Sequence, residues 1–365
     1  MTINRLFVDS RVRSHPETLR IIKKISLAPE YVDDPVPIYN WVNGATDPVR
    51  LGKSVLYLTQ NKGGFLKACP GTREYVCCDY QILHVASFCT MDCAYCILQT
   101  YFHPPLLHFF VNLENLETEL DDLFKKQAIV RVGTGEFTDS LIWEDWTDLT
   151  DFLVDRFSRQ DRAVLELKTK TVNISRLKHL DHRRRTILAW SLNSPFVIRH
   201  EERHTTPLAA RLAAAAQCQE WGYPLAFHFD PLVIYPDCEA DYHQVVKQIF
   251  ERISPDSIVW ISIGAFRFMP ALKPVIIRRF PDSMLPYGEF VTGLDNKMRY
   301  FKPLRIALYR KMVSWIKDIA PQVTVYCCME DADVWEKALG LQISENHELG
   351  ALLDQSAERV CGVRP

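Results

Sequence analysis

The sequence lacks long hydrophobic runs, low-complexity segments and short-period repeats. No stretch reaches about 18 apolar residues without a charged residue, the minimum for a membrane-spanning helix, so no membrane association is expected. The N-terminal residues, MTINRLFVDSRVRSH, contain no apolar segment followed by a small-residue cleavage site. We therefore expect no signal peptide and predict a cytoplasmic protein.

No charge of one sign dominates the chain. Of its 365 residues, 24% are charged and 47% are apolar, and the formal net charge is −2. This composition excludes a disordered, fibrous or strongly basic chain and is typical of one large α/β domain with extensions. It does not exclude a nucleic-acid partner, because a local patch of cations is enough to bind phosphates.

Apolar runs of strand length alternate with segments of helical period from about residue 80 onward. The expected strands cover residues 82–87, 128–133, 164–168, 186–191, 224–229 and 257–263. The expected helices cover residues 113–124, 146–157, 208–221 and 241–253, and a later helix and strand cover residues 305–319 and 323–327.

Such alternation predicts a parallel sheet with right-handed crossovers. Six units predict an α/β fold, a partial (β/α)6 barrel of the TIM type, with an active site at the C-terminal ends of the strands. We expect an N-terminal extension packed on the core (residues 1–78), the partial barrel core (79–265) and a C-terminal cap or substrate region (266–365).

The cysteines indicate a metal site. The chain has eleven, and six of them lie between Cys69 and Cys96. The odd number and this clustering favour metal ligation over a disulfide framework. The segment Cys89-Thr-Met-Asp-Cys93-Ala-Tyr95-Cys96 follows the first expected strand directly, so we expect a loop at the C-terminal end of that strand.

Three thiolates can hold three irons of a [4Fe–4S] cluster and leave the fourth iron without a protein ligand. We predict that Cys89, Cys93 and Cys96 hold such a cluster, and that its open iron binds S-adenosylmethionine for reductive cleavage to a 5′-deoxyadenosyl radical. The alternative is a zinc knuckle completed by His84 or Cys78. Structural zinc sites usually contain two CxxC-like pairs, and the sequence has no second pair at a suitable spacing.

This spacing resembles the signature of the radical S-adenosylmethionine superfamily, Cys-x3-Cys-x2-Cys with an aromatic residue, here Tyr95, before the last cysteine. In that superfamily a Gly-Gly-Glu-type motif ends the second strand, and its backbone holds the methionyl amino group. Here Gly133-Thr-Gly135-Glu136 stands at that place, and glycine suits a backbone that approaches a ligand closely. The alternative for this motif is a plain strand-to-helix turn.

Further motifs resemble those of spore photoproduct lyase and its relatives. They are Cys96-Ile-Leu-Gln-Thr, Phe110-Val-Asn-Leu-Glu, Lys168-Thr-Lys170, Trp190-Ser-Leu-Asn193-Ser and Arg211-Leu-Ala-Ala-Ala. The similarity runs from about residue 54 to 265 and more loosely to 335. It implies a radical enzyme related to DNA-repair lyases that acts on a nucleic acid or nucleotide. We also expect a reductant such as ferredoxin or flavodoxin as a partner.

The resemblance implies a set of cofactor-binding residues. They are Tyr95, at the adenine of S-adenosylmethionine, and Gly133, Gly135, Thr138, Lys170, Ser191 and Asn193. A lysine at a strand end offers a point charge for a carboxylate, and hydroxyl and amide groups suit a ribose. The alternatives are a solvated Lys170 and a helix-capping turn at Ser191 and Asn193.

Two carboxylates, Glu136 and Asp230, are the catalytic candidates. Asp230 precedes a proline at an apolar strand end, where a carboxylate needs a partner. Glu136 matches the place where the lyase has the cysteine that returns a hydrogen atom to the product radical, and Ile97 stands where it has a second tyrosine. A carboxylic O–H cannot donate a hydrogen atom at a cost comparable to a thiol S–H. We therefore expect the radical-generating chemistry of the lyase followed by different later steps.

Other cysteines leave two interpretations open. Cys69, Cys77 and Cys78 precede the cluster motif, and Cys327 and Cys328 end the last expected strand. They are either hydrogen donors or ligands of an auxiliary cluster, or they are small buried hydrophobic residues, as free cysteines often are.

Cations and aromatic residues are interleaved between Arg267 and Arg310, as in surfaces that follow a phosphate backbone and stack on bases. Acidic residues occur in the same segment, so a mixed solvated surface is the alternative. Two other functions also stay open: a radical enzyme that acts on a substrate other than nucleic acid, and a metal-binding module without catalysis.

Overall fold

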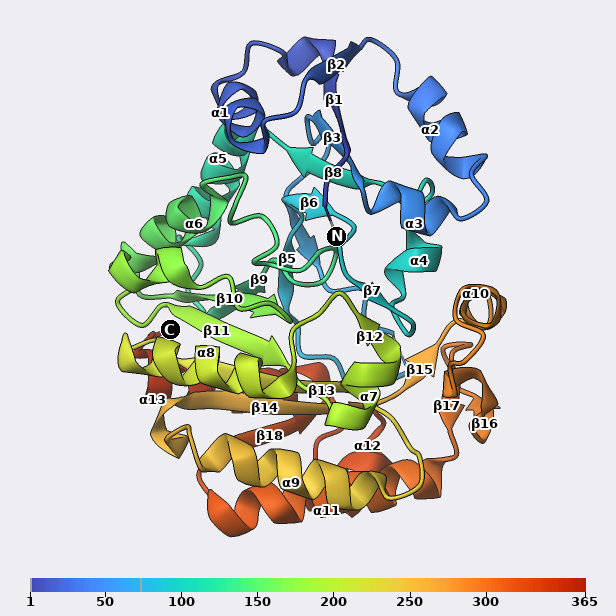
Figure 1. The fold of residues 1–365 in the computed structure, drawn as a ribbon. Coiled ribbons are helices and arrows are strands. Elements are labelled where there is room, and N and C mark those ends of the chain that lie inside the picture. The colour runs from blue at the N-terminus through green and yellow to red at the C-terminus, as the bar shows by residue number, and fades with distance from the viewer. Residues whose placement is uncertain (1, 73) are drawn as a thin grey trace.

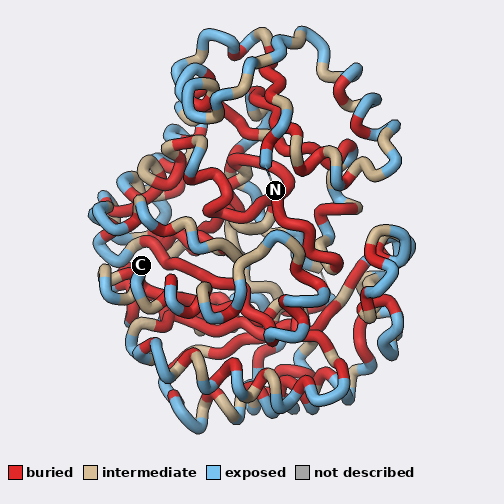
Figure 2. The backbone as a smooth tube through the Cα atoms, viewed as in Figure 1, coloured by how far each residue is buried: buried red, intermediate tan, exposed pale blue. Residues whose placement is uncertain are grey.

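The computed structural model describes residues 2–72 and 74–365. Two large sheets organise these residues: an eight-stranded sheet curled into an open barrel and a five-stranded sheet above it in Figure 1. One continuous apolar core contains side chains of both sheets, such as Leu6 and Leu56 from the smaller sheet and Val132 and Ile261 from the larger. Figure 2 shows this core as the buried strands at the centre of the molecule.

The larger sheet has the strand order β18-β14-β13-β11-β10-β9-β5-β4. These strands are β4 (Leu66–Ala68), β5 (Gln81–Leu83), β9 (Val130–Gly133), β10 (Ala163–Thr169), β11 (Thr186–Ser191), β13 (Leu225–Leu232), β14 (Ile258–Ala265) and β18 (Thr324–Cys327). All neighbours are parallel except β4, which is antiparallel to β5. All residues of β11 and β14 are buried, as expected for parallel strands that are covered on both faces.

Helices connect these strands, and α13 follows the last of them. They are α5 (Leu113–Leu123), α6 (Leu149–Ser158), α7 (Pro195–Glu201), α8 (Leu208–Glu220), α9 (Cys238–Phe250), α11 (Lys302–Ile319) and α13 (Asn346–Cys361). The alanine-rich α8 ends as its sequence predicts, because Gly222 adopts a φ of +89° just beyond it, a conformation that glycine reaches without strain. The predicted fold class, a partial α/β barrel, is confirmed.

The smaller sheet has the order β2-β1-β3-β8-β6. Its strands are β1 (Arg5–Asp9), β2 (Pro29–Val32), β3 (Val55–Thr59), β6 (Ala86–Ser87) and β8 (Leu107–Phe110), and its helices are α1 (Pro16–Ile25), α2 (Val36–Asn43) and α3 (Pro48–Gly52). The remaining short elements are β7 (Asp92–Cys93), β12 (Glu202–Arg203), α4 (Leu98–Tyr101), β15 (Arg267–Phe268), α10 (Leu272–Arg279), β16 (Phe290–Thr292), β17 (Met298–Tyr300) and α12 (Ala332–Val334).

The sheets do not follow the predicted segment boundaries. The expected strand at 82–87 breaks in two, because the chain bends at His84 and Val85: β5 pairs with β9, whereas β6 pairs with β8 in the smaller sheet. The smaller sheet therefore combines strands from the expected N-terminal extension with two from the expected core. Likewise β18, from the expected cap, pairs with β14 and becomes a seventh parallel strand of the barrel. The three-part division itself stays a prediction.

Among the described residues, no helix combines the length and apolarity that crossing a membrane requires.

Two half-buried histidines, His84 and His108, make the stability depend on pH. Burial lowers the pKa of each from 6.5 to about 4. The unfolded chain then binds more protons than the folded chain between these values, so the free energy of unfolding falls as the pH decreases through this window. We expect each histidine to account for a loss of about 2 kcal/mol between roughly pH 7 and pH 5, measured by urea unfolding.

The variant His84→Gln isolates this effect, because it keeps a side chain able to hydrogen-bond Ser87 but cannot titrate. It should lose its share of the pH dependence, whereas the exposed control His347→Gln should keep the wild-type profile. An unchanged profile in His84→Gln would contradict the prediction.

Candidate functional site

The cysteine motif forms an irregular loop after β6, at the mouth of the barrel. The loop turns at Phe88, which has a φ of +73° and donates its N–H to the carbonyl of Phe137 at 2.8 Å. The short strand β7 then pairs with β12, and the N–H of Ala94 bonds the carbonyl of Glu201 at 2.8 Å. The loop is thus held against segments that follow the second and fourth parallel strands of the barrel.

The three motif thiols fit the predicted cluster by their chemistry. Cys89 and Cys93 are buried, Cys96 is half-buried, and all three are free. Burial raises the pKa of the Cys89 thiol to about 12 and raises that of Cys93, and the charge of Cys96 would raise both further. The thiols are therefore near enough to interact electrostatically. Iron binding would offset this penalty, because a coordinating metal deprotonates thiols.

A zinc knuckle receives no support from the described residues. No three of their His, Cys, Asp and Glu side chains are placed as a single metal ion requires. The suggested fourth ligands lie elsewhere: His84 Nε2 is 2.9 Å from the hydroxyl of Ser87, and Cys78 contacts Cys77 instead of the motif. Three sulfur donors without a nitrogen or fourth sulfur donor suit an iron–sulfur cluster with one open iron.

A buried lysine supports the loop from the smaller sheet. Lys53 is 1% exposed, and its ammonium group donates to the carbonyls of Cys89, at 3.1 Å, and Met91. The same group lies 4.5 Å from the ring centroid of Phe88 and 3.8 Å from Asp92. Sequence reasoning missed Lys53, because a lysine 36 residues before the motif carries no local signal of this contact.

An amide and a guanidinium complete the support. Gln99 donates to the carbonyls of Cys93, Ala94 and Cys96 at 3.1 to 3.3 Å. Arg279 of α10 in turn donates to the Gln99 side-chain oxygen. Gln99 belongs to the Leu-Gln-Thr motif noted in the sequence, so a signal for it existed without an assigned role.

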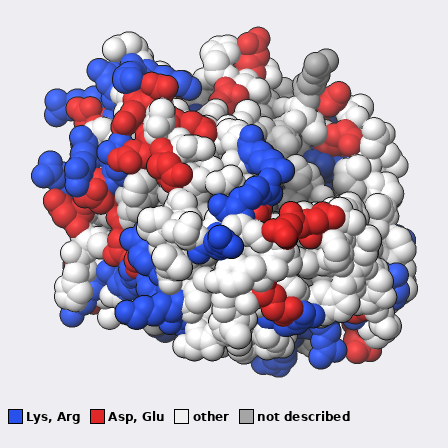
Figure 3. Space-filling view, turned by 90° about the horizontal axis from the view of Figure 1, so that it is seen from above, with Lys and Arg blue, Asp and Glu red and all other residues white. Residues whose placement is uncertain are grey.

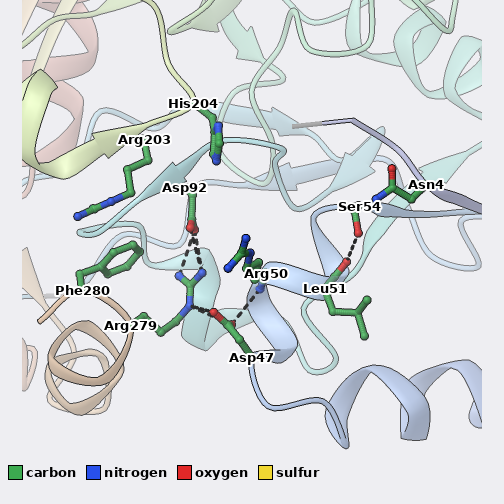
Figure 4. Close-up of a pocket in the computed structure, with 10 residues that line it drawn as sticks. All are labelled: Asn4, Asp47, Arg50, Leu51, Ser54, Asp92, Arg203, His204, Arg279 and Phe280. Carbon is green, nitrogen blue, oxygen red and sulfur yellow. Dashed lines mark hydrogen bonds and ion pairs between the residues drawn. The ribbon is translucent and has the colours of Figure 1, made fainter.

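Arg279 also bridges two acidic side chains next to the loop (Figure 4). It contacts Asp92 through its two terminal nitrogens, Nη1 and Nη2, at 3.0 to 3.1 Å and Asp47 through its Nε at 3.0 Å. These three residues line a cavity of about 730 Å³ together with Arg50, Arg203 and His204. Both acids are paired, so the cations Arg50 and Arg203 give the cavity an excess of positive charge.

The predicted adenine contact, Tyr95, is brought close to Lys170. The Lys170 ammonium lies 5.7 Å from the ring centroid of Tyr95, and its charge acts on the Cys93 thiol. The Tyr95 hydroxyl donates to Glu202, which also binds Arg211 at 2.6 Å in a fully buried ion pair. Sequence reasoning missed Glu202, although the Arg211 motif was noted.

Other predicted cofactor residues have protein partners of their own. A Cβ on Gly133 would lie 1.6 Å from the Tyr80 hydroxyl, and one on Gly135 would lie 2.7 Å from the Cβ of Lys168, so packing alone requires both glycines. The Thr138 hydroxyl accepts a hydrogen bond from Trp143 at 3.1 Å.

The Asn193 side chain bonds Pro231, Tyr242 and Ser194 at 2.8, 2.7 and 3.0 Å, which saturates its oxygen. Ser191 lies at the end of β11, and its carbonyl accepts from Arg211 at 2.8 Å. Thr138 and Asn193 therefore have structural partners, whereas Tyr95 and Lys170 lie together and Lys170 acts on Cys93. The role of Ser191 stays a prediction.

A buried carboxylate, Asp139, fixes the strand end that carries Lys170. It accepts hydrogen bonds from the Thr169 hydroxyl at 2.8 Å, the Lys170 N–H at 2.8 Å and the Leu141 N–H at 3.0 Å. Burial raises its pKa. Sequence reasoning missed Asp139, because only the folded chain brings these donors together.

Both predicted catalytic carboxylates form ion pairs. Glu136 accepts from Lys168, and Asp230 forms a two-pronged pair with Arg267 at 3.1 Å for each contact. The need of Asp230 for a partner is thus met by Arg267. Their catalytic roles stay predictions.

The basic segment is mostly committed to internal ion pairs. Asp230, Asp295 and Glu330 pair with Arg267, Arg299 and Arg305, of which the last two are buried. In this segment the exposed cations Lys273 and Arg278 on α10 have no ion pair among the described residues. The mixed-surface alternative therefore describes this segment better than a continuous phosphate-binding track.

The curled parallel sheet and the three-cysteine loop at its mouth define a protein of the radical S-adenosylmethionine superfamily. A sequence model of the family described as spore photoproduct lyase matches residues 72–302. This match covers more than half of the chain, so the chain belongs to the spore photoproduct lyase family.

Two curated relatives are named spore photoproduct lyase. The protein of Clostridium acetobutylicum is 25% identical over 227 residues, which cover 61% of this chain and 65% of the relative. That of Bacillus subtilis is 26% identical over 209 residues, which cover 56% and 61%. The matched part therefore spans less than two thirds of the length of these relatives.

Solved structures of spore photoproduct lyase variants share the fold. One with dinucleoside spore photoproduct has a TM-score of 0.78 at 20% identity and covers 90% of this chain and 100% of its own. Another, with bound AdoMet and dinucleoside spore photoproduct, has a TM-score of 0.77 at 21% identity and covers 89% and 98%.

Removing the Lys53 ammonium should loosen the cysteine loop. In Lys53→Met two buried carbonyls lose their donor, at a cost of about 1–3 kcal/mol each in the free energy of unfolding. We expect a lower midpoint of urea unfolding and less iron retained after anaerobic reconstitution, measured by iron analysis. Lys62→Met, at an exposed lysine, is the matched control. Wild-type stability and iron content in Lys53→Met would show that the loop does not need this support.

Proposed function

We propose that Cys89, Cys93 and Cys96 hold a [4Fe–4S] cluster and that the chain uses S-adenosylmethionine for radical chemistry. The observation that carries the proposal is the set of three free thiols on one loop at the mouth of a curled sheet, in a chain of the spore photoproduct lyase family. When bound and reduced, the cluster supplies the electron that cleaves S-adenosylmethionine to a 5′-deoxyadenosyl radical.

The protein's part is to bind and orient. Lys170 presents a cation beside Tyr95 and Cys93, where it would attract the carboxylate of the methionyl group. Asp139 accepts a hydrogen bond from the Lys170 backbone N–H and so fixes the position from which the Lys170 side chain extends. Ser191, at the end of the next strand, would offer its hydroxyl to a ribose.

The proposed substrate is a nucleic acid or nucleotide. Two structures with this fold contain dinucleoside spore photoproduct, which supports this class of substrate. The ion pairs Lys168–Glu136 and Asp230–Arg267 lie at the barrel mouth. They would line the path of the substrate. Figure 3 shows both signs of charge interspersed on the upper face. We place the phosphate contacts at Lys273 and Arg278, because both cations are exposed and have no ion pair among the described residues.

The radical step is tested by product analysis. After anaerobic reconstitution and reduction with dithionite, the wild type should form 5′-deoxyadenosine from S-adenosylmethionine. The variant Cys93→Ala should form at least about 100-fold less product, because it loses a cluster ligand. Even the loss of a residue that only holds a metal ligand typically costs about 10–100-fold in activity. Cys238→Ala, at a buried thiol in α9, should behave as the wild type. Equal product from wild type and Cys93→Ala would refute the assignment.

The substrate class is tested separately by binding. Single- and double-stranded DNA should bind at low salt and dissociate as salt increases, because phosphate contacts release counterions. Arg278→Glu should weaken binding to all sequences and reduce the salt slope by about 1, as expected for one phosphate contact. Lys126→Glu, beyond α5, is the control. If neither DNA nor RNA binds at low salt while 5′-deoxyadenosine still forms, the substrate is of another class.

A further inference from the structure

The cavity of about 730 Å³ beside the cysteine loop has walls from separate parts of the chain. Arg50 comes from α3, and Phe280 follows α10. Asp92 and Arg203 face each other on the paired strands β7 and β12. In Figure 4, Arg50 and Arg203 lie on opposite sides of the ion pair between Asp92 and Arg279. A cavity of this volume is large enough for a small-molecule ligand.

The two carboxylates of this cavity are neutralised by groups of the protein. Asp92 binds Arg279 at 3.0 to 3.1 Å and lies 3.8 Å from the Lys53 ammonium. Asp47 binds the Nε of Arg279 at 3.0 Å. Two cations therefore offset two carboxylates, and the charges of the other two arginines remain uncompensated within the described part of the chain.

Arg203 is held in place but lacks an acceptor for one of its N–H groups. Its guanidinium carbon lies 4.4 Å from the ring centroid of Phe280, which is a cation–π distance. Its Nη1 is buried and has no hydrogen-bond partner among the described residues. A buried donor without an acceptor destabilises a structure, and an oxygen atom of an anionic ligand in the cavity would supply the acceptor.

Arg50 approaches the cavity from the other wall. Its backbone N–H donates to the Asp47 carboxylate at 3.0 Å, whereas its exposed side chain has no ion pair among the described residues. His204 lines the same cavity. Partial burial lowers the pKa of His204, so the ring is neutral at pH 7 and can donate a hydrogen bond to an anion without adding charge.

We propose that this cavity binds a ligand with two phosphate groups, one at Arg50 and one at Arg203, with His204 as a further donor. Guanidinium groups match the oxygens of a phosphate in pairs. Because the two arginines lie on opposite sides of a saturated ion pair, each faces a different part of the ligand. The site goes beyond the proposed radical chemistry, because it needs neither the cluster nor S-adenosylmethionine.

Two sources offer neighbouring phosphate groups: a free diphosphate and the backbone of a nucleic acid. The helix that brings Arg279 to the cavity, α10, also presents the exposed cations Lys273 and Arg278. A nucleic acid bound at these cations would thus pass close to the cavity. The two sources share the same chemistry, and competition between them separates the two.

Isothermal titration calorimetry with inorganic pyrophosphate tests the site on the anaerobically reconstituted full-length protein at low salt. The wild type should bind one pyrophosphate per chain. Arg50→Gln and Arg203→Gln should each weaken this binding at least about tenfold, because each removes a charged donor from one phosphate. Arg203→Lys, which keeps the charge, should lose less. Arg252→Gln, at an exposed arginine before β14, should bind as the wild type, and circular dichroism checks that every variant is folded.

Competition then identifies the source. Displacement of pyrophosphate by single-stranded DNA without terminal phosphates would support the proposal with a nucleic-acid backbone as the ligand. Displacement by ADP but not by DNA would support it with a free diphosphate.

Three results would overturn the proposal. They are no binding of pyrophosphate at low salt, an affinity that neither Arg50→Gln nor Arg203→Gln changes, as for pyrophosphate bound at an iron, and substitutions that weaken only the binding of a flavodoxin. The last result would make the cavity a contact for a protein partner. Formation of 5′-deoxyadenosine is measured separately, so the failure of one proposal leaves the other intact.

Discussion

The cysteine loop depends on the saturation of its buried carbonyl groups. A loop cannot satisfy its backbone through a regular ladder, and each buried carbonyl without a donor destabilises the fold. Here the donors come from side chains: the Lys53 ammonium reaches Cys89 and Met91, and the Gln99 amide reaches three further carbonyls. The loop therefore keeps its conformation without relying on regular structure.

This way of holding the loop explains why the two sheets are one functional unit. Lys53 lies between α3 and strand β3 of the smaller sheet, and Arg279, which fixes Gln99 and Asp92, comes from α10, between β15 and β16. Segments before and after the motif in the sequence thus support it. The buried pair Glu202–Arg211 has a related role on the barrel side, since Glu202 also holds the Tyr95 hydroxyl.

The barrel mouth contains two sulfur groups in different surroundings. Near Cys93 the charges come from Lys170 and Glu202, whereas near Cys69 the neighbours are other thiols and Glu136. A thiol pKa follows burial, charge and hydrogen bonds, so the same side chain meets different conditions for losing its proton in the two places. The two cysteine stretches, residues 69–78 and 89–96, are close in the sequence. The β4–β5 pair places them in different parts of the molecule.

The local pattern of the sequence was enough to locate most of the parallel strands and helices and to single out the cysteine motif. Alternating strand and helix periods depend on neighbouring residues, and so does the spacing of Cys89, Cys93 and Cys96. The resemblance to spore photoproduct lyase singled out Tyr95 and Lys170, which the fold brings together. By contrast, the N-terminal strands are short and lie between helices, so their pairing with β8 left no periodic signal.

Only the tertiary structure decided which polar groups meet. Gly133 faces Tyr80, the Asn193 oxygen is saturated by Tyr242 and Ser194, and Lys53 lies under the cysteine loop. The contacts of Gly133 with Tyr80, Asn193 with Tyr242, and Lys53 with the loop join residues far apart in the chain. A sequence motif specifies the chemical groups that are present, but the directions of the strands and the closing of the sheet determine their distances, and the distances determine which group binds which.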